Sequence, residues 1–245
     1  MIFDLDGTLV DSERHGHRVA FNQAFEEFDL PYRWDEETYG ELLRITGGRR
    51  RIARYLESEG VAEGERDKLS AALHERKTEI LKQMVAEGRV EARPGVHRLL
   101  AELGDGGCRL AIATTGSRGW VDGLLDQVLG GTSRFEVIVT GDEVEERKPD
   151  PEAFTLAMER LSIDSGAVVV EDSAEGLEAA RAAGLPCVVV VNGYTADHDL
   201  SGADLVLDGF GEPGEGATVL ADRRDTGCTG VLDAGVLRRL LERAK

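Results

Sequence analysis

The sequence predicts an α/β protein: a doubly wound, Rossmann-like parallel sheet with an inserted all-helical module. Two observations lead to this prediction. Short, continuous apolar runs alternate with helix-like segments after residue 93, whereas the sequence between residues 12 and 92 is polar and helical in its periodicity. Strands that are apolar on both sides must be covered on both faces, which is typical of parallel sheets with helical crossovers. We therefore expect a core of residues 1–11 and 93–245 and a helical module of residues 12–92.

The elements of the core are expected in strict alternation. The apolar pair Ile2-Phe3 predicts a first strand, which ends where acidic residues and a glycine begin a loop. Further strands are expected at 110–113, 137–139, 167–170, 187–191 and 203–207. Helices are expected at 96–103, 119–129, 151–161, 174–183 and 234–244. The Gly-rich segment 211–230 lacks periodicity, so we expect a loop there.

The inserted module shows helices and no convincing strand. Phe21, Ala24, Phe25 and Phe28 recur at helical spacing, and residues 67–84 form a long helical pattern. Glycines at 47, 48 and 60 separate the further helices that the apolar residues of 42–56 indicate.

Composition and charge exclude several classes of protein. The 245 residues contain 29 Lys and Arg against 47 Asp and Glu, a net charge of −18, which argues against nucleic acid or an anionic membrane as partner. No apolar run approaches the ~18–20 residues of a membrane helix, and acidic residues from Asp4 onward argue against a signal peptide. The three widely spaced cysteines suit a reduced compartment. We expect a cytoplasmic monomer whose partner is a small molecule.

Positive charge is concentrated in one place, the segment 44–54, which contains five arginines and no acid. An anionic substrate requires such a local cluster in so acidic a chain. A solvated helix face is the alternative interpretation, and for Arg50 and Arg54 it is the preferred one.

Polar side chains follow several strands of the predicted core at the edge where ligands bind in open α/β sheets. In chain order they are Asp4 and Asp6, Thr114 and Thr115, Lys148, and Glu171 with Asp172. Clustered carboxylates need a cation, and a set of oxygen donors without Cys or His suits Mg²⁺ better than zinc. Magnesium and a lysine together indicate phosphoryl chemistry. The spacing of Asp4 and Asp6 permits one to act as nucleophile while the other transfers protons.

Taken singly, each of these signals has a structural explanation. An Asp-x-Asp after a strand is commonly a cap or a turn, and the Asp172-Ser173 pair suits a helix N-cap. Their conjunction, in this order on successive strand ends, favours a functional site.

The blocks 3–8, Thr114, 148–151 and 171–173 resemble the four-motif signature of the haloacid dehalogenase superfamily of phosphohydrolases, and the helical insertion resembles its first class of cap domain. The resemblance implies that Asp4 is the nucleophile, Asp6 the general acid and base, and that Thr114 and Lys148 hold the phosphoryl oxygens. It also implies that Asp4, the Asp6 carbonyl and Asp172 bind Mg²⁺, with Glu171 close by. An Asp at position 6 favours phosphoryl transfer over dehalogenation.

Further blocks resemble the CbbY-like sugar-bisphosphate phosphatases, whose members hydrolyse the 1-phosphate of xylulose 1,5-bisphosphate. The blocks are 13–22, 39–43, 46–49 beginning at Thr46, 77–79, 114–117 and 193–195. The resemblance implies that the cap binds a distal phosphate and the sugar hydroxyls. The substrate-binding residues it implies are Glu13, His17, Gly48, Arg49, Arg51, Lys77 and Thr115. Family members often carry Lys at the position of Arg49 and Thr at that of Gly116, which bears on the identity of the sugar.

The sequence therefore predicts a Mg²⁺-dependent phosphatase of a small phosphorylated sugar, with xylulose 1,5-bisphosphate as the expected substrate. A phosphomutase of the β-phosphoglucomutase type is the first alternative, since it shares every core residue. Phosphoglycolate phosphatase is the second, and a non-enzymatic phospho-acceptor protein on the same fold is the third.

Overall fold

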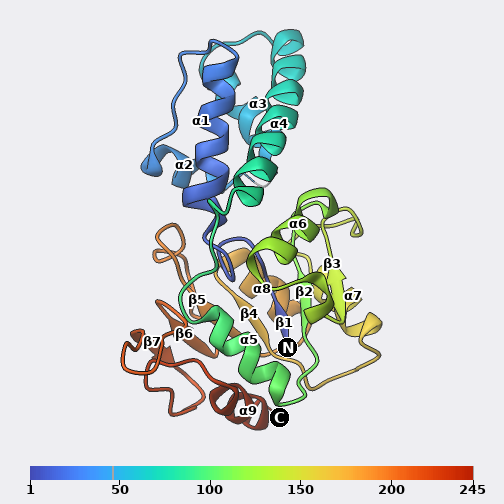
Figure 1. The fold of residues 1–245 in the computed structure, drawn as a ribbon, viewed down its shortest axis with the longest axis vertical. Helices are drawn as coiled ribbons and strands as arrows, with labels where there is room; N and C mark the ends of the chain where they lie inside the picture. The colour runs from blue at the N-terminus through green and yellow to red at the C-terminus, as the bar shows by residue number, and fades with distance from the viewer. Residues whose placement is uncertain (46, 245) are drawn as a thin grey trace. The chain divides into compact units, whose positions relative to one another are not determined.

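The computed structural model describes residues 1–45 and 47–244 (Figure 1). The chain divides into two compact units. One comprises Met1–Asp11 and Glu91–Lys245, and the other comprises Ser12–Val90. We call the first unit the core and the second the cap. Thr46, which opens one of the blocks quoted above, lies outside the described residues.

One mixed sheet forms the centre of the core. Within residues 1–45 and 47–244 it has seven strands in the order β3-β2-β1-β4-β5-β6-β7, all parallel except β7, which is antiparallel to β6. The strands are β1 (Ile2–Phe3), β2 (Ala111–Ala113), β3 (Val137–Val139), β4 (Val169–Glu171), β5 (Cys187–Val190), β6 (Leu205–Leu207) and β7 (Val219–Asp222). The predicted α/β fold class is confirmed.

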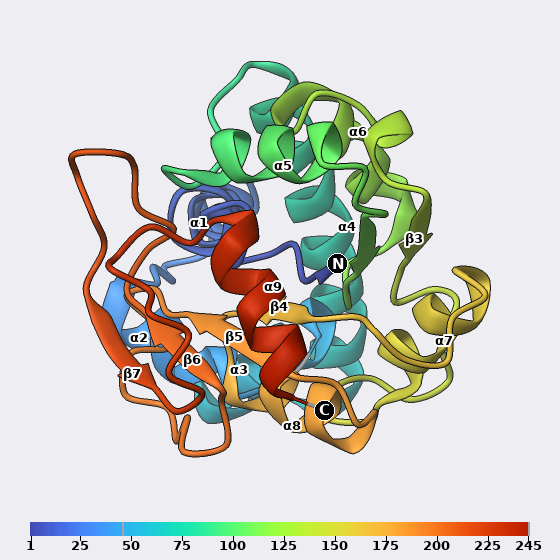
Figure 2. The ribbon, with the colours of Figure 1, turned by 90° about the horizontal axis from the view of Figure 1, so that it is seen from below.

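Helices cover the sheet on both faces because its strands are apolar on both. Side chains alternate along a strand, so Ile2 and Phe3 point to opposite faces, yet both are fully buried. Helices α7 (Glu152–Arg160) and α8 (Ala174–Ala182) pack together against strands β2 to β5. Helix α5 (Val96–Asp105), which contacts α9 (Ala234–Arg243), lies on the opposite side of the sheet (Figure 2). Helix α6 (Arg118–Val128) and the short η2 (Thr132–Arg134) lie between β2 and β3 in the chain.

The strand order places a topological switch point beside β1. The chain continues from β1 to β2 on one side of it, and β4 pairs with its other side. Ligands of open α/β sheets bind at the carboxyl ends of the strands that flank such a point. Asp4 directly follows β1, and Asp172 directly follows β4.

The prediction of a loop for residues 211–230 is wrong in part, because β7 lies within that segment. Its residues pair with β6 through backbone hydrogen bonds, whereas its side chains are only partly covered and Leu220 is 53% exposed. An edge strand of this kind forms through backbone hydrogen bonds to its neighbour. Its side chains need not be buried, so the sequence shows only a weak apolar pattern. The other predicted elements of the core agree with the structure to within two residues at each end.

All the regular secondary structure among the described residues of the cap is helical. It consists of η1 (Glu13–His17, a π-helical turn), α1 (Arg18–Glu27), α2 (Glu36–Leu43), α3 (Gly48–Ser58) and α4 (Glu63–Ala86). Helices α1 and α3 pack on α4, and an aromatic cluster that includes Phe21, Phe25 and Trp34 fills the interior. Asp35 accepts a hydrogen bond from the Thr38 amide and so caps α2. Among the described residues, none of the helices in either unit has the length and apolar character to cross a membrane.

Candidate active site

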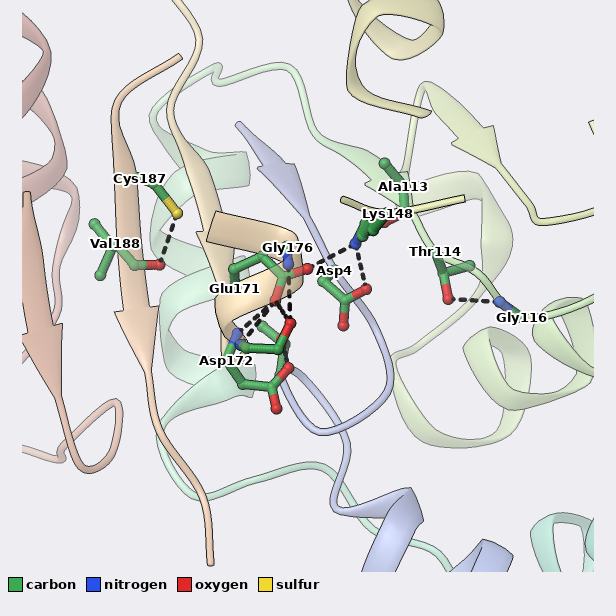
Figure 3. Close-up of polar contacts among 12 residues, drawn as sticks. Asp4, Ala113, Thr114, Gly116, Lys148, Glu171, Asp172, Gly176, Cys187 and Val188 are labelled. Atoms are coloured by element: carbon green, nitrogen blue, oxygen red, sulfur yellow. Dashed lines mark hydrogen bonds and ion pairs between the residues drawn. The ribbon is translucent and has the colours of Figure 1, made fainter. Parts of the chain in front are cut away.

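The ammonium group of Lys148 lies between two carboxylates at the carboxyl ends of β1 and β4 (Figure 3). Its Nζ donates hydrogen bonds to Asp4 Oδ1 and Glu171 Oε1, each at 2.7 Å, and to the Ala113 carbonyl of β2 at 2.9 Å. All three charged side chains are buried. A cation held this way offsets the repulsion between the two carboxylates.

Asp172 is held on both of its oxygens by neighbours in the core. Thr8 donates to Oδ1 at 2.9 Å, and the amide of Asn192 donates to Oδ2 at 2.7 Å. The second donor also reaches the Gly7 carbonyl, at 3.2 Å. The loop after β1, the end of β4 and the segment after β5 are thus joined by side-chain hydrogen bonds, which fix the orientation of the Asp172 carboxylate.

Glu171 is held at the start of helix α8. Its Oε2 accepts hydrogen bonds from the Asp172 amide, the Ser173 amide and the Ser173 hydroxyl at 2.8–3.0 Å. Gly176 is required beneath it, because a Cβ at that position would lie 1.8 Å from Glu171 Oε1. Sequence inspection did not single out this glycine, whose helical position offers no local signal.

Burial and mutual repulsion disturb the ionisation of the carboxylates. Burial raises the pKa of Asp4 to about 7, although Lys148 opposes the shift; the charges of Glu171 and Asp6 add to it. Burial, followed by the charges of Glu171 and Asp4, raises the pKa of Asp172 well above its ordinary value. Burial also disfavours the charged form of Glu171, but Lys148 and the amides at the start of α8 outweigh it and lower the pKa of Glu171 overall.

The donor set fits a hard divalent cation. Asp4, Glu171 and Asp172 each offer a carboxylate oxygen, and these oxygens lie within 4.8 Å of one another. A buried cluster of oxygen donors, two of which resist ionisation by themselves, is a site that binding a cation would stabilise. Asp6 lies beside the cluster and acts on Asp4 through its charge.

Thr114 and Thr115 lie in the loop after β2. The Thr114 side chain is buried, and its hydroxyl oxygen accepts the Gly116 amide at 3.0 Å, which leaves its proton available to an acceptor. Thr115 is half-buried, and its backbone passes so close to Gly141 that a Cβ there would lie 2.3 Å from the Thr115 carbonyl oxygen.

The predicted substrate residues of the cap form a basic cluster with two branches. In one, Lys77 Nζ lies 2.5 Å from His17 Nδ1 and 4.9 Å from the centre of the Phe21 ring. In the other, the Tyr39 hydroxyl donates to Glu13, and Arg51 donates to that hydroxyl at 3.3 Å and to the Leu42 carbonyl at 2.9 Å.

Arg49 is exposed, whereas Arg51 is buried and already bonded within the cap. In the π-helical turn, Glu13 and His17 contact different partners, Tyr39 and Lys77. Arg50 and Arg54 are exposed, as expected for a solvated face.

His74 is a member of the basic cluster that sequence inspection missed. A Cβ at Gly48 would lie 2.8 Å from its ring. Burial and, after it, the charges of Lys77, His17, Arg49 and Arg51 together lower the pKa of His74 to about 4. One turn of helix separates His74 from Lys77, and that spacing was the available signal.

Two core residues were also missed. Asn192 directly follows the apolar run of β5, a position at which the other site residues were found. Arg93 precedes Pro94-Gly95 and gave no motif, because its role depends on carbonyl groups from three distant segments.

The ends of β1 and β4 carry buried Asp4, Glu171 and Asp172, and Lys148 contacts two of these carboxylates from the loop before α7. This arrangement on a doubly wound sheet is that of a haloacid dehalogenase-like hydrolase. The sequence model of that family matches residues 1–190. The chain is 42% identical over 223 residues to the CBBY-like protein of Arabidopsis thaliana, covering 88% of this chain and 70% of the relative. It is 43% identical over 218 residues to Protein CbbY of Cereibacter sphaeroides, covering 87% of this chain and 93% of the relative.

Solved structures show the same similarity. CbbY from Rhodobacter sphaeroides in complex with phosphate matches with a TM-score of 0.75 and 41% identity, over 85% of this chain and 92% of that one. A variant of that CbbY in complex with xylulose-(1,5)bisphosphate matches with a TM-score of 0.75 and 40% identity, over the same shares. A putative β-phosphoglucomutase from Thermotoga maritima matches with a TM-score of 0.66 and 27% identity, over 84% and 91%. The chain belongs to the haloacid dehalogenase-like hydrolase family, as its sequence motifs predicted.

Proposed function

We propose that this protein is a Mg²⁺-dependent phosphatase that hydrolyses a small phosphorylated sugar, with xylulose 1,5-bisphosphate as the best-supported substrate. The observation that carries the proposal is the buried Asp4 carboxylate, which Lys148 contacts at 2.7 Å and which shares one site with Glu171 and Asp172. The Lys148 ammonium can bind the oxygens of a phosphate group. The neighbouring Asp4 carboxylate is then placed to attack the phosphorus atom.

In the proposed reaction, an Asp4 oxygen forms a bond to phosphorus while the bond from phosphorus to the sugar oxygen breaks. Asp6 gives its proton to the departing oxygen, so the sugar leaves as a neutral alcohol. Asp6 then takes a proton from water, whose oxygen attacks phosphorus and releases inorganic phosphate, restoring the Asp4 carboxylate. Lys148 and the Thr114 hydroxyl hold the phosphoryl oxygens throughout.

Asp4, Asp172 and the Asp6 carbonyl are the proposed ligands of Mg²⁺, with Glu171 close by. When bound, the ion offsets the negative charge of the carboxylates and of the phosphate they must approach. The oxygen-only donor set and the raised pKa values of Asp4 and Asp172 support this assignment.

The cap supports a bisphosphate as the substrate. Its cluster of His17, Arg49, Lys77 and the start of α3 at Gly48 is cationic, in a chain with a net charge of −18. We propose that Arg49 binds the phosphate that is not hydrolysed, because it is exposed and a guanidinium grips phosphate at two points. Arg51, Glu13 and Thr115 are proposed to complete the substrate site. The solved complex of a similar CbbY with xylulose-(1,5)bisphosphate supports this choice.

The test is phosphate release with Mg²⁺ and with a chelator, on xylulose 1,5-bisphosphate, ribulose 1,5-bisphosphate, fructose 1,6-bisphosphate, phosphoglycolate and glucose 1-phosphate. We expect the xylulose compound to have the highest kcat/KM and Arg49→Ala to lose that preference. Arg50→Ala, which changes an exposed neighbour, is the matched control. Equal activity on mono- and bisphosphates, unaffected by Arg49→Ala, contradicts the bisphosphate assignment.

A β-phosphoglucomutase activity is the second candidate, supported by the similarity to the putative β-phosphoglucomutase. The two reactions differ in whether water or a second sugar oxygen accepts the phosphoryl group from Asp4. Conversion of glucose 1-phosphate to the 6-phosphate, without free phosphate, would favour the mutase.

A further inference from the structure

Arg93 binds the backbone of the core at several points beside the proposed active site. Its Nη1 donates to the carbonyls of Gly7 and Val190, each at 2.8 Å, and its Nη2 donates to that of Val191 at 2.6 Å. The Phe210 ring packs against the guanidinium at 5.6 Å. One side chain thus joins the loop after β1 to the carboxyl end of β5.

The Gly7 carbonyl links Arg93 to the carboxylates of the site. It accepts hydrogen bonds from both Arg93 and Asn192, and Asn192 also donates to Asp172 Oδ2. Gly7 has a φ of 83°, and a Cβ there would lie 2.7 Å from Asp172 Oδ2. The position of this loop therefore sets how closely the backbone approaches Asp172.

Arg93 also supplies charge. Burial lowers its pKa, and the charge of Asp172 is first among those that oppose the shift. An arginine keeps its proton under these conditions.

We propose that Arg93 is a positioning residue of the metal site: it holds the Asp4–Thr8 loop and the end of β5 in the spacing at which Asp172 and Asp4 bind a divalent cation. The inference rests on the proposed metal-dependent reaction but not on which sugar phosphate is hydrolysed. Loss of Arg93 is expected to weaken cation binding and lower kcat, with little effect on KM at saturating cation. Its bonds go to backbone carbonyls of the core, so the effect on substrate is indirect.

The experiment measures Mn²⁺ binding by electron paramagnetic resonance in wild type, Arg93→Met and Arg93→Lys, together with kcat and KM at saturating Mg²⁺. Arg98→Met is the matched control. Arg98 also donates to backbone carbonyls, those of Gly211 and Leu232, at 2.9 and 3.0 Å. Loss of outer-shell partners typically weakens metal binding about 10–100-fold, and we expect a loss in that range for Arg93→Met. Arg93→Lys, which keeps the charge and one donor group, should recover part of it, and Arg98→Met should bind Mn²⁺ like wild type.

Wild-type Mn²⁺ affinity in folded Arg93→Met overturns the inference, and so does Arg93→Lys binding no better than Arg93→Met. If Arg93→Met does not fold, Arg93→Gln takes its place, since the amide can donate to one carbonyl but carries no charge; unchanged affinity in that variant also overturns the inference. A wild-type protein that binds no Mn²⁺ overturns the proposed metal site itself, and the inference with it.

Discussion

Lys148 donates a 2.7 Å hydrogen bond to Asp4, although the two residues are 144 positions apart in the chain. The bond joins the loop before α7 to the end of the first strand and leaves both side chains buried. The positive charge of Lys148 opposes the rise that burial causes in the pKa of Asp4, which nevertheless reaches about 7.

Asp4→Asn should abolish turnover while the protein stays folded. The amide is close in shape to the carboxylate, but it cannot form the bond to phosphorus, so we expect kcat to fall by about three orders of magnitude or more. Phosphate release and thermal unfolding, measured on the same preparation, check this. A variant with near-normal turnover contradicts the assignment of Asp4 as nucleophile.

Lys148→Met should destabilise the core more at pH 8 than at pH 5. Removing one partner of a buried ion pair leaves Asp4 and Glu171 uncompensated, which typically costs about 3–5 kcal/mol. At lower pH the Asp4 carboxyl can take up a proton, so the cost falls. Urea unfolding in chelator at the two pH values measures the difference from wild type. An equal loss of unfolding free energy at both pH values contradicts the electrostatic role.

His74 should make the cap less stable in acid. Its pKa is lowered to about 4 in the folded protein, against 6.5 when unperturbed, so between these values the unfolded chain binds more protons than the folded one. Stability contributed by the neutral ring is therefore present above pH 6.5 and is lost as the pH falls toward 4. His74→Gln, which cannot be protonated, should show a smaller fall in melting temperature from pH 7 to pH 5. Parallel curves for the two proteins contradict the assignment.

Gly176→Ala should displace Glu171. The added Cβ would lie 1.8 Å from Glu171 Oε1, and that side chain is held by Lys148 and by the backbone amides just before α8. Overpacking of this kind costs about 1–3 kcal/mol, and kcat should fall because Lys148 loses a partner. Gly123→Ala, in helix α6 with no atom within 4 Å of its Cβ, is the control and should unfold no more easily than wild type. Wild-type stability and activity in Gly176→Ala contradict the tight packing of Glu171.

The sequence by itself determined the fold class, the order of the core elements and the family. Strand–helix alternation is a local property, and the acidic block after Phe3 and the pair Glu171-Asp172 are contiguous in the chain. Each therefore leaves a pattern that can be read without a structure.

The tertiary structure alone decided which groups hold those residues. Strand β7 was missed because it forms through backbone hydrogen bonds to β6 and its side chains are only partly covered. Its sequence therefore shows no apolar alternation. Arg93 and Asn192 were missed because both act on the Gly7 carbonyl, a group that every residue carries and no motif records. Hydrophobic patterns and motifs depend on residues that are neighbours in the chain. The positions of backbone carbonyls and buried charges, by contrast, are set only when distant segments pack together.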